Sequence, residues 1–206
     1  MSTSYNIKSY CRIKNNQVAL NGDVLFEDES ISFLDFIKAA YKSQNTNYPK
    51  FFKMDNLSKL AFIAADVLLK NGNINPEQDN DIAIVFSNKA SSLDTDRKHQ
   101  ESIQNKESYY PSPAVFVYTL PNICIGEISI KYKLYSENSF FIFDNFNAAH
   151  LFSYTNSLLS SNKATQVLCG WVEFDDENNY EAFLYLVGEE GRINHSKKDI
   201  ITLYNT

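Results

Sequence analysis

The stretch that most constrains the fold of this 206-residue chain covers residues 139–174. Phe140 to Phe143 form an apolar run with no polar interruption, which is typical of a strand covered on both faces. Asp144 and Asn145 end this run, and both have side-chain oxygens that can cap the first turn of a helix. Apolar residues at helical spacing follow, and residues 164–174 read as a second strand. The sequence therefore predicts a strand, a sharp turn, a buried helix and a returning strand.

This arrangement bears on function because the turn delivers side chains to the start of a helix. The free N–H groups and the dipole of the first helical turn stabilise negative charge there. Many enzymes place a nucleophile at such a position, and Asp144 and Asn145 occupy it here. We expect one of these two residues to be the helix cap.

The remaining segments alternate between strands and helices, which predicts a layered α/β sheet in a single domain over residues 1–206. Asn21-Gly22 between two apolar runs predicts a β-hairpin, because both residues tolerate positive φ. The apolar stripe of residues 54–69 predicts a helix capped by Asp55 or Asn56. The other elements expected are a first strand at 5–13, a helix at 32–41, a buried strand at 82–87, a polar surface segment at 91–106, a helix from Pro121 to 133, a strand at 180–187 and an edge strand at 200–204.

Composition narrows the classes of protein. A net charge of −6 and a pI near 5.1 disfavour nucleic-acid binding. No run reaches the roughly 20 apolar residues of a membrane helix, and the N-terminus lacks the apolar core of a signal peptide, so we expect a cytoplasmic protein. The three cysteines are far apart in apolar strings, which predicts reduced core residues and no metal site.

Three motifs, in order along the chain, carry a resemblance to a known family. The helix 54–69 begins Lys-Met54-Asp55 and continues with Leu-Ala-x-x-Ala-Ala. Leu-Pro121-Asn122 follows, with Gly126 four residues later. The returning strand ends in Cys-Gly170-Trp-Val-Glu173. In this order and spacing the chain resembles the β-ketoacyl-ACP synthases, the condensing enzymes of the thiolase superfamily.

The resemblance implies a single thiolase-like half-fold: a layered mixed sheet with helices on both faces and a buried central helix. It also places Asn145 where the family has its nucleophilic cysteine. The family takes two further catalytic histidines from its C-terminal half, and these 206 residues correspond to the N-terminal half. The resemblance therefore identifies no catalytic residue in this chain, and it implies no cofactor.

Other nucleophiles and bases are present in less suitable contexts. His99 is expected in a solvated segment, His195 in a polar loop, and His150 about 140° around the helix from Asn145. A set made of Asp144, His150 and Ser153 would put its serine partway along a buried helix. Cys124 and Cys169 lie within apolar elements, where a thiolate is disfavoured.

Several functions stay open on this basis. The first is a non-catalytic partner, scaffold or acyl-pocket subunit of fatty-acid or polyketide-type synthesis, with polyene or pigment-type lipids as candidate products. The second is an acyltransferase or decarboxylase completed by a partner chain, and the third is an unrelated binding module. Residues 139–143 are expected to end the sheet as an uncharged edge strand, which proteins normally pair or protect. The resemblance implies that this strand pairs across a two-fold axis through Phe140, Phe141, Ile142 and Phe143, in a homodimer or with a full-length ketosynthase-like subunit. An acyl carrier protein is a further candidate partner.

Overall fold

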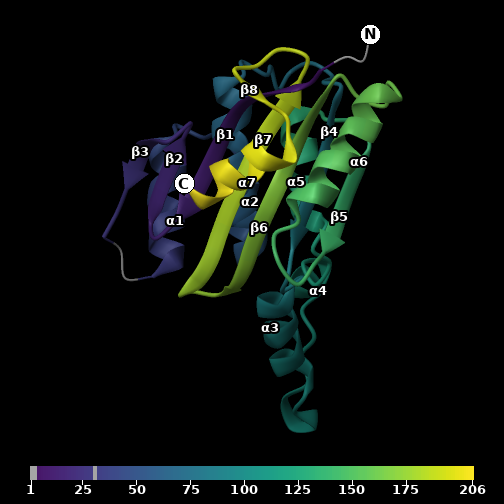
Figure 1. The fold of residues 1–206 in the computed structure, drawn as a ribbon. Coiled ribbons are helices and arrows are strands. Elements are labelled where there is room, and N and C mark those ends of the chain that lie inside the picture. The colour runs from purple at the N-terminus through teal and green to yellow at the C-terminus, as the bar shows by residue number, and fades with distance from the viewer. Residues whose placement is uncertain (1–3, 30–31) are drawn as a thin grey trace.

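A computed structural model describes residues 4–29 and 32–206, and its centre is one mixed sheet (Figure 1). The strands lie in the order β3-β2-β1-β7-β6-β4-β5, with β8 paired to β1. β4 runs parallel to both β5 and β6, and the other pairs are antiparallel. The strands are β1 (Asn6–Lys14), β2 (Gln17–Leu20), β3 (Asp23–Glu27), β4 (Ile82–Asn88), β5 (Asn138–Ile142), β6 (Gln166–Asp176), β7 (Asn179–Gly188) and β8 (Ile193–Asn194).

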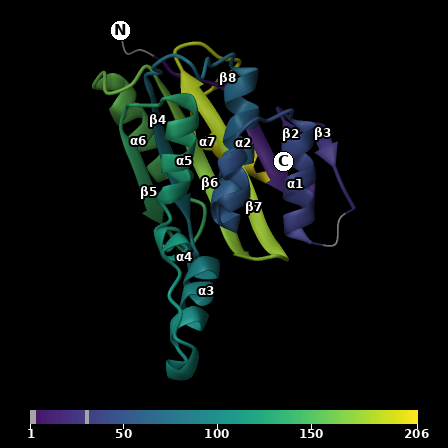
Figure 2. The ribbon, with the colours of Figure 1, turned by 180° about the vertical axis from the view of Figure 1, so that it is seen from behind.

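Helices cover both faces of this sheet, as predicted. One face carries α1, α2 and α5, and the other carries α6 and α7 (Figures 1 and 2). The α-helices are α1 (Phe33–Ser43), α2 (Asn56–Asn71), α3 (Leu93–Ile103), α4 (Pro113–Val117), α5 (Ile123–Tyr132), α6 (Ala148–Ser160) and α7 (Lys197–Asn205), with short 3-10 helices η1 (Pro49–Lys53) and η2 (Lys106–Ser108). None of the helices in the described ranges is long and apolar enough to cross a bilayer.

Two hairpins build the β3 edge of the sheet. The predicted turn at Asn21 and Gly22 is confirmed, with φ values of 54° and 92°. A second hairpin turns at Asn15 and Asn16, again with positive φ. Asparagine and glycine accept this conformation at low cost, which explains both tight connections.

α2 is the buried helix of its face. Asp55 caps it, as expected, by accepting a hydrogen bond from the Ser58 backbone N–H at 2.9 Å. Deeper in the helix, Asp66 is fully buried and accepts from Tyr132 Oη at 2.7 Å, while Lys70 Nζ lies 2.7 Å from its carboxylate. A buried charge of this kind is tolerated because it is paired and hydrogen-bonded.

Two predictions about elements were wrong. Residues 200–204 belong to helix α7 and are not an edge strand, because Ser196 caps a helix there by accepting from the Asp199 N–H at 3.1 Å. α5 begins at Ile123 with Asn122 as its N-cap, so Pro121 lies before the helix and not at its first position. The polar surface segment expected at 91–106 is confirmed, and most of it forms helix α3 on a projection from the body of the molecule (Figure 2).

The 139–174 stretch has the predicted order, but two of its details differ. β5 lies at the edge of the sheet, as expected of a strand that pairs with another chain, but its side chains are half-exposed and not covered on both faces. α6 is not buried all round. Ala149, Ser153 and Ser157 form an exposed side of small residues, and the apolar residues of α6 are covered by the sheet, α7 and the rings of β5.

Candidate functional site

The candidate site lies at the carboxyl end of β5, where the chain turns into α6. The turn is held against the neighbouring strand because the Phe143 N–H donates to the Asn88 carbonyl of β4 at 2.9 Å. A hollow of 480 Å³ opens at this end of α6. It is lined by Phe143, Asp144, Asn145, Phe146, Asn147, Ala148, Ala149 and, from α7, Ile201.

The helix cap is Asn147, two residues later than predicted. Its side-chain Oδ1 accepts from the His150 backbone N–H at 2.9 Å, so α6 begins at Ala148. The assignment of Asp144 or Asn145 as the cap was therefore wrong. Both of these side chains are exposed at the rim of the hollow, and neither has a hydrogen bond within the described part of the chain. The chain needs two more residues to leave the β5 edge before it can start the helix.

The lining of this hollow lacks a nucleophile. Among the described residues it presents carboxylate, amide and apolar side chains, with no thiol, hydroxyl or imidazole. The three cysteines are all fully buried. Burial raises the pKa of the Cys169 thiol to about 12, while hydrogen bonding toward Tyr185 and Thr155 acts in the opposite direction. Burial also raises the pKa of Cys124 and that of Cys11.

The histidines lie outside the hollow. His150 faces the rings of β5, with its centroid 4.4 Å from Phe141 and 4.9 Å from Phe143. Its buried Nε2 has no hydrogen-bond partner in the described ranges. No hydrogen bond joins His150 to Ser153 there, and Ser153 is exposed rather than enclosed.

The other two histidines are more enclosed than predicted. His99 is partly buried on α3 against Phe116, with ring centroids 5.3 Å apart. His195 is 5% exposed, and its Nδ1 lies 3.0 Å from Asn156 Oδ1. Burial lowers the pKa of His195 to about 4, so this ring is neutral near neutral pH. No group of three or more potential metal-ligating side chains is found in the described residues.

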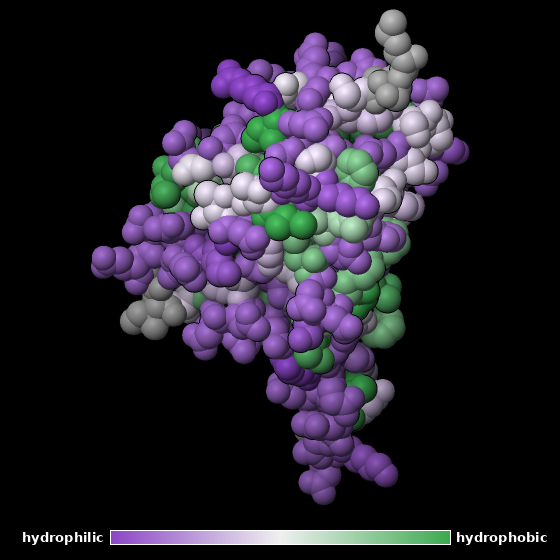
Figure 3. Space-filling view, viewed as in Figure 1, coloured by the Kyte–Doolittle hydropathy of each residue, from purple (hydrophilic) through white to green (hydrophobic). Residues whose placement is uncertain are grey.

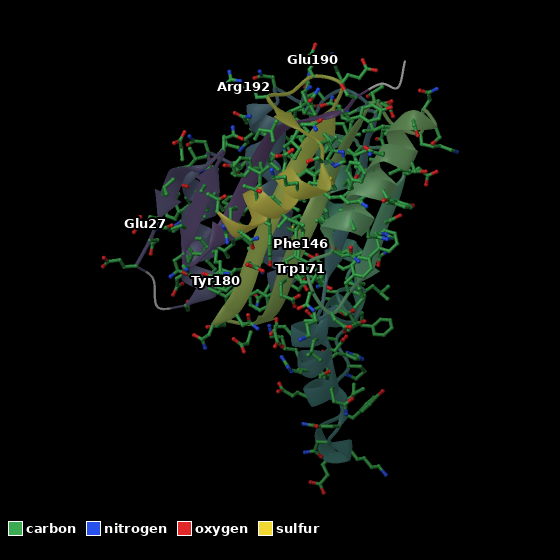
Figure 4. The ribbon with its side chains drawn as sticks, in the orientation of Figure 1. Glu27, Phe146, Trp171, Tyr180, Glu190 and Arg192 are labelled. Carbon is green, nitrogen blue, oxygen red and sulfur yellow. The ribbon has the colours of Figure 1, made fainter. Side chains whose placement is uncertain are left out.

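An aromatic cluster of Phe146, Trp171 and Tyr204 packs beside the turn between β5 and α6. Phe146 stacks on Tyr204 of α7 at 4.0 Å between ring centroids, and its edge contacts Trp171 of β6 at 6.3 Å. Figure 4 shows Phe146 and Trp171 close together, with Trp171 midway along β6. Through this cluster α7 fixes the turn between β5 and α6. Sequence reasoning missed the cluster because its members lie far apart in the chain.

Two of the motif residues shape the strands around the site. Gly170 has φ +152°, and a Cβ atom there would lie 2.0 Å from the Phe183 carbonyl oxygen, so only glycine fits. The Glu173 carboxylate accepts from the backbone N–H groups of Lys89 and Ala90 at 2.7 and 3.0 Å. Burial raises the pKa of Glu173, and these two hydrogen bonds act to lower it. Glu173 thus holds the loop that follows β4.

The remaining motif residues serve the other face. Met54 is 3% exposed in the core, and Asp55 accepts from Thr95 Oγ1 at 2.9 Å as well as capping α2. Burial raises the pKa of Asp55, while its hydrogen bonds to Ser58 and Thr95 oppose the shift. Asn122 caps α5 without a side-chain hydrogen bond. At Gly126 no atom lies within 4 Å of a Cβ built on the backbone, so close packing does not require glycine there.

Comparison with known proteins identifies the fold. No family model and no curated protein matches the sequence. Solved structures do match: the ishigamide ketosynthase/chain length factor superimposes with a TM-score of 0.64 at 18% identity, over 90% of this chain and 62% of that chain. A type II polyketide synthase acyl-carrier protein in complex with its ketosynthase (AntDE:AntF) gives a TM-score of 0.61 at 14% identity, over 92% of this chain and 64% of that chain.

A third structure is matched over nearly all of its length. It is the ketosynthase ApeO in complex with its chain length factor ApeC from Xenorhabdus doucetiae, with a TM-score of 0.62 at 13% identity, over 99% of this chain and 91% of the matched chain. The chain therefore has the thiolase-like ketosynthase fold, as the motifs predicted. The chain spans 62% of the length of the ishigamide ketosynthase/chain length factor chain that it matches. It spans 91% of the length of the matched chain in the ApeO–ApeC complex.

Proposed function

We propose that this chain is a non-catalytic, ketosynthase-like subunit of fatty-acid or polyketide-type biosynthesis that pairs with another chain of the same fold. The observation that carries the proposal is the lining of the hollow at the start of α6. Where the resembling family has its cysteine, this chain has Asn145, exposed at the rim.

The chemistry follows from that residue. Acyl transfer needs a nucleophile with an available lone pair, and an amide nitrogen has none that can be activated by losing or gaining a proton near neutral pH. The thiols that the chain does contain are buried in the core, with pKa values raised by desolvation. We therefore infer that the chain has the fold of a condensing enzyme but lacks, at Asn145, the cysteine thiol that would carry the acyl chain.

The edge of the sheet supports a pairing role. β5 leaves one side of its backbone unpaired, and such an edge is normally paired or protected. Phe140 and Phe141 of β5 and Phe143 just after it are half-buried, and Ile142 is 50% exposed. Eight of the thirteen exposed large hydrophobic residues in the described ranges fall between residues 109 and 142: Tyr109, Tyr110, Phe116, Val117, Leu120, Ile130, Tyr135 and Ile142.

The similar structures also favour this role. One contains a ketosynthase with its chain length factor, and another contains a ketosynthase with an acyl-carrier protein. We therefore infer that the partner is a ketosynthase-like chain and that an acyl carrier protein visits the complex. The proposed surface for the first partner is Phe140, Phe141, Ile142 and Phe143.

A reconstitution experiment tests the proposal. The chain is co-expressed with a ketosynthase from the same organism, and acyl-carrier and malonyl-carrier substrates are supplied to the purified proteins. We expect no chain extension by this protein alone, co-purification with the ketosynthase, and a change in product length detected by mass spectrometry when it is present.

Phe141→Lys provides the matched variant, because it puts a charge on the β5 edge and leaves the hollow intact. It should abolish co-purification while the protein stays folded by circular dichroism. Chain extension by the isolated wild-type protein, above a heat-inactivated control, would show that the proposal is wrong. So would the absence of binding to any ketosynthase of its organism.

A further inference from the structure

A second hollow lies on the sheet face that carries α6 and α7, at the edge of the sheet opposite β5. α7 crosses β7 and ends near β1, so β2 and β3 are left open on this face (Figure 1). A hollow of 370 Å³ is formed here by β1, β2, β3 and the last turn of α7, and we call it the β1 hollow. Figure 3 shows this part of the face as mostly hydrophilic, with small hydrophobic areas over β3 and α7.

The strand register explains why the surface is hollowed at this place. Arg12 of β1 lies opposite Phe183 of β7 on one side and opposite Ala19 of β2 on the other, and Ala19 lies opposite Val24 of β3. Residues directly opposite each other in neighbouring strands have their side chains on the same face. The small Ala19 side chain therefore leaves space between Arg12 and Val24, and Leu203 of α7 lines the same space.

The charged side chains that line the β1 hollow are all positive. The chain has a net charge of −6, yet the lining contains Arg12 and Lys14, and none of its described residues has a carboxylate side chain. The hydroxyl of Tyr10 and the amides of Asn15 and Gln17 add neutral hydrogen-bonding groups. This lining is complementary to an anion.

Arg12 is the charge that a ligand would reach. Lys14 Nζ already lies 3.0 Å from the Glu181 carboxylate, which also accepts a hydrogen bond from Tyr204 Oη. Arg12 is half-buried, and within the described part of the chain it has neither an ion pair nor a hydrogen bond. Partial burial of an unpaired charge costs free energy, which a bound counter-charge would recover.

We propose that the β1 hollow binds a small amphipathic anion, with a carboxylate or phosphate head on Arg12 and a short apolar body against Val24 and Leu203. The planar guanidinium matches the oxygens of both kinds of head. A volume of 370 Å³ lies within the range of about 300–1,000 Å³ that is usual for small-molecule sites. The site is separate from β5, so the proposal goes beyond pairing with a ketosynthase-like chain and does not depend on it.

Titration calorimetry in a buffer free of phosphate and sulfate tests the proposal with three probes that share one apolar body. The probes are hexyl phosphate, hexanoate and hexanol. We expect at least one of the two anions to bind with a stoichiometry of one, and the comparison between them identifies the preferred head. Hexanol should bind at least about tenfold more weakly, because it lacks the charge that Arg12 recognises. Failure of both anions to bind, or equal binding of hexanol, would overturn the proposal.

Two variants locate the binding. Arg12→Gln should weaken it at least about tenfold and leave the Tm of the unliganded protein unchanged, because no internal contact is lost. Ala19→Leu fills the β1 hollow, keeps the charge, and should also abolish binding.

The matched control is Arg192→Gln, because Arg192 is exposed on the loop between β7 and β8 and lies outside the β1 hollow (Figure 4). This variant should bind as the wild type does, and so should Phe141→Lys. Unchanged binding in Arg12→Gln or in Ala19→Leu would show that the anion binds elsewhere. An equal loss in Arg192→Gln would show that only the general charge of the protein attracts it. Either result would overturn the proposal.

Discussion

Two glycines of the resembling motifs have opposite roles at the scale of single residues. At Gly170 the Phe183 carbonyl leaves no room for a side chain, and the backbone has positive φ. At Gly126, inside α5, the space around a Cβ is empty. The sequence motifs could not distinguish the roles of Gly170 and Gly126, because a motif gives the residue type and not the atoms that surround it in the fold.

Alanine substitutions should therefore shift stability in opposite directions. Gly170→Ala should lower the free energy of unfolding by more than about 3 kcal/mol or prevent folding, because backbone must move to relieve the clash. Gly126→Ala should raise it by up to about 1 kcal/mol, since alanine restricts the unfolded chain and favours helix. Urea denaturation of both variants checks this, and a neutral effect at Gly170 would contradict the geometry.

Local sequence signals predicted those residues whose role depends on near neighbours. The Asn21-Gly22 hairpin and the Asp55 cap are set by backbone conformation and by groups two or three positions away, so the sequence contains the information. Phe146 and Trp171 were not found, because their contact depends on how α7 returns to the sheet. The resemblance placed Asn145 at the family's cysteine position, but it gave no sign that the capping role falls to Asn147.

At the scale of elements, the boundary between β5 and α6 shows what sequence reading resolves and what it does not. Asp144, Asn145 and Asn147 are all good capping types, and only the path of the turn selects one. The same holds for residues 197–205, which alternate weakly. Ser196 before them and Asp199 in their first turn form a helix-start pattern that outweighs the β-branched residues. The order of most elements was predictable, whereas the starts of α6 and α7 depended on tertiary contacts.

The α6 cap gives a prediction with an internal control. Asn147→Ala should lower the free energy of unfolding by about 1 kcal/mol, because the His150 N–H loses its acceptor. Asn145→Ala should change it by less than about 0.5 kcal/mol, as expected for an exposed side chain. Thermal or urea unfolding measures both. Equal losses in the two variants would mean that the turn, and not the cap, determines the stability of this helix.

At the scale of the whole molecule, the last segment closes the sheet face that carries α6. β8 pairs with β1, the His195 N–H donates to the Tyr5 carbonyl at 3.0 Å, and α7 covers the cluster around Phe146. His195 lies at the centre of this segment, packed on Phe152 with ring centroids 5.2 Å apart. The segment from β8 to α7 connects β1, α6 and α7. We therefore expect protonation of the His195 ring to change the stability of the whole fold.

Burial of His195 predicts how stability changes with pH. Desolvation lowers the pKa of His195 from 6.5 to about 4 in the folded protein. Between these two pH values the unfolded chain therefore binds a proton at His195 that the folded chain does not bind. The contribution of His195 to the free energy of unfolding is therefore fully present above pH 6.5. It is lost as the pH falls from 6.5 toward 4 and does not change further below pH 4. A shift of this size corresponds to a loss on the order of 3 kcal/mol.

His195→Asn removes the titration and keeps an amide near the position of Nδ1, which lies beside Asn156. Carboxylates titrate equally in both proteins, so the difference between wild type and variant isolates His195. We expect urea denaturation to show the wild type losing stability relative to the variant between pH 6.5 and pH 4, because only the wild type takes up the additional proton on unfolding. A difference that stays constant across this range would mean that the ring is protonated inside the fold, with a partner for its Nε2. The segment 189–206 would then be held by an ionic contact and not by burial of a neutral ring.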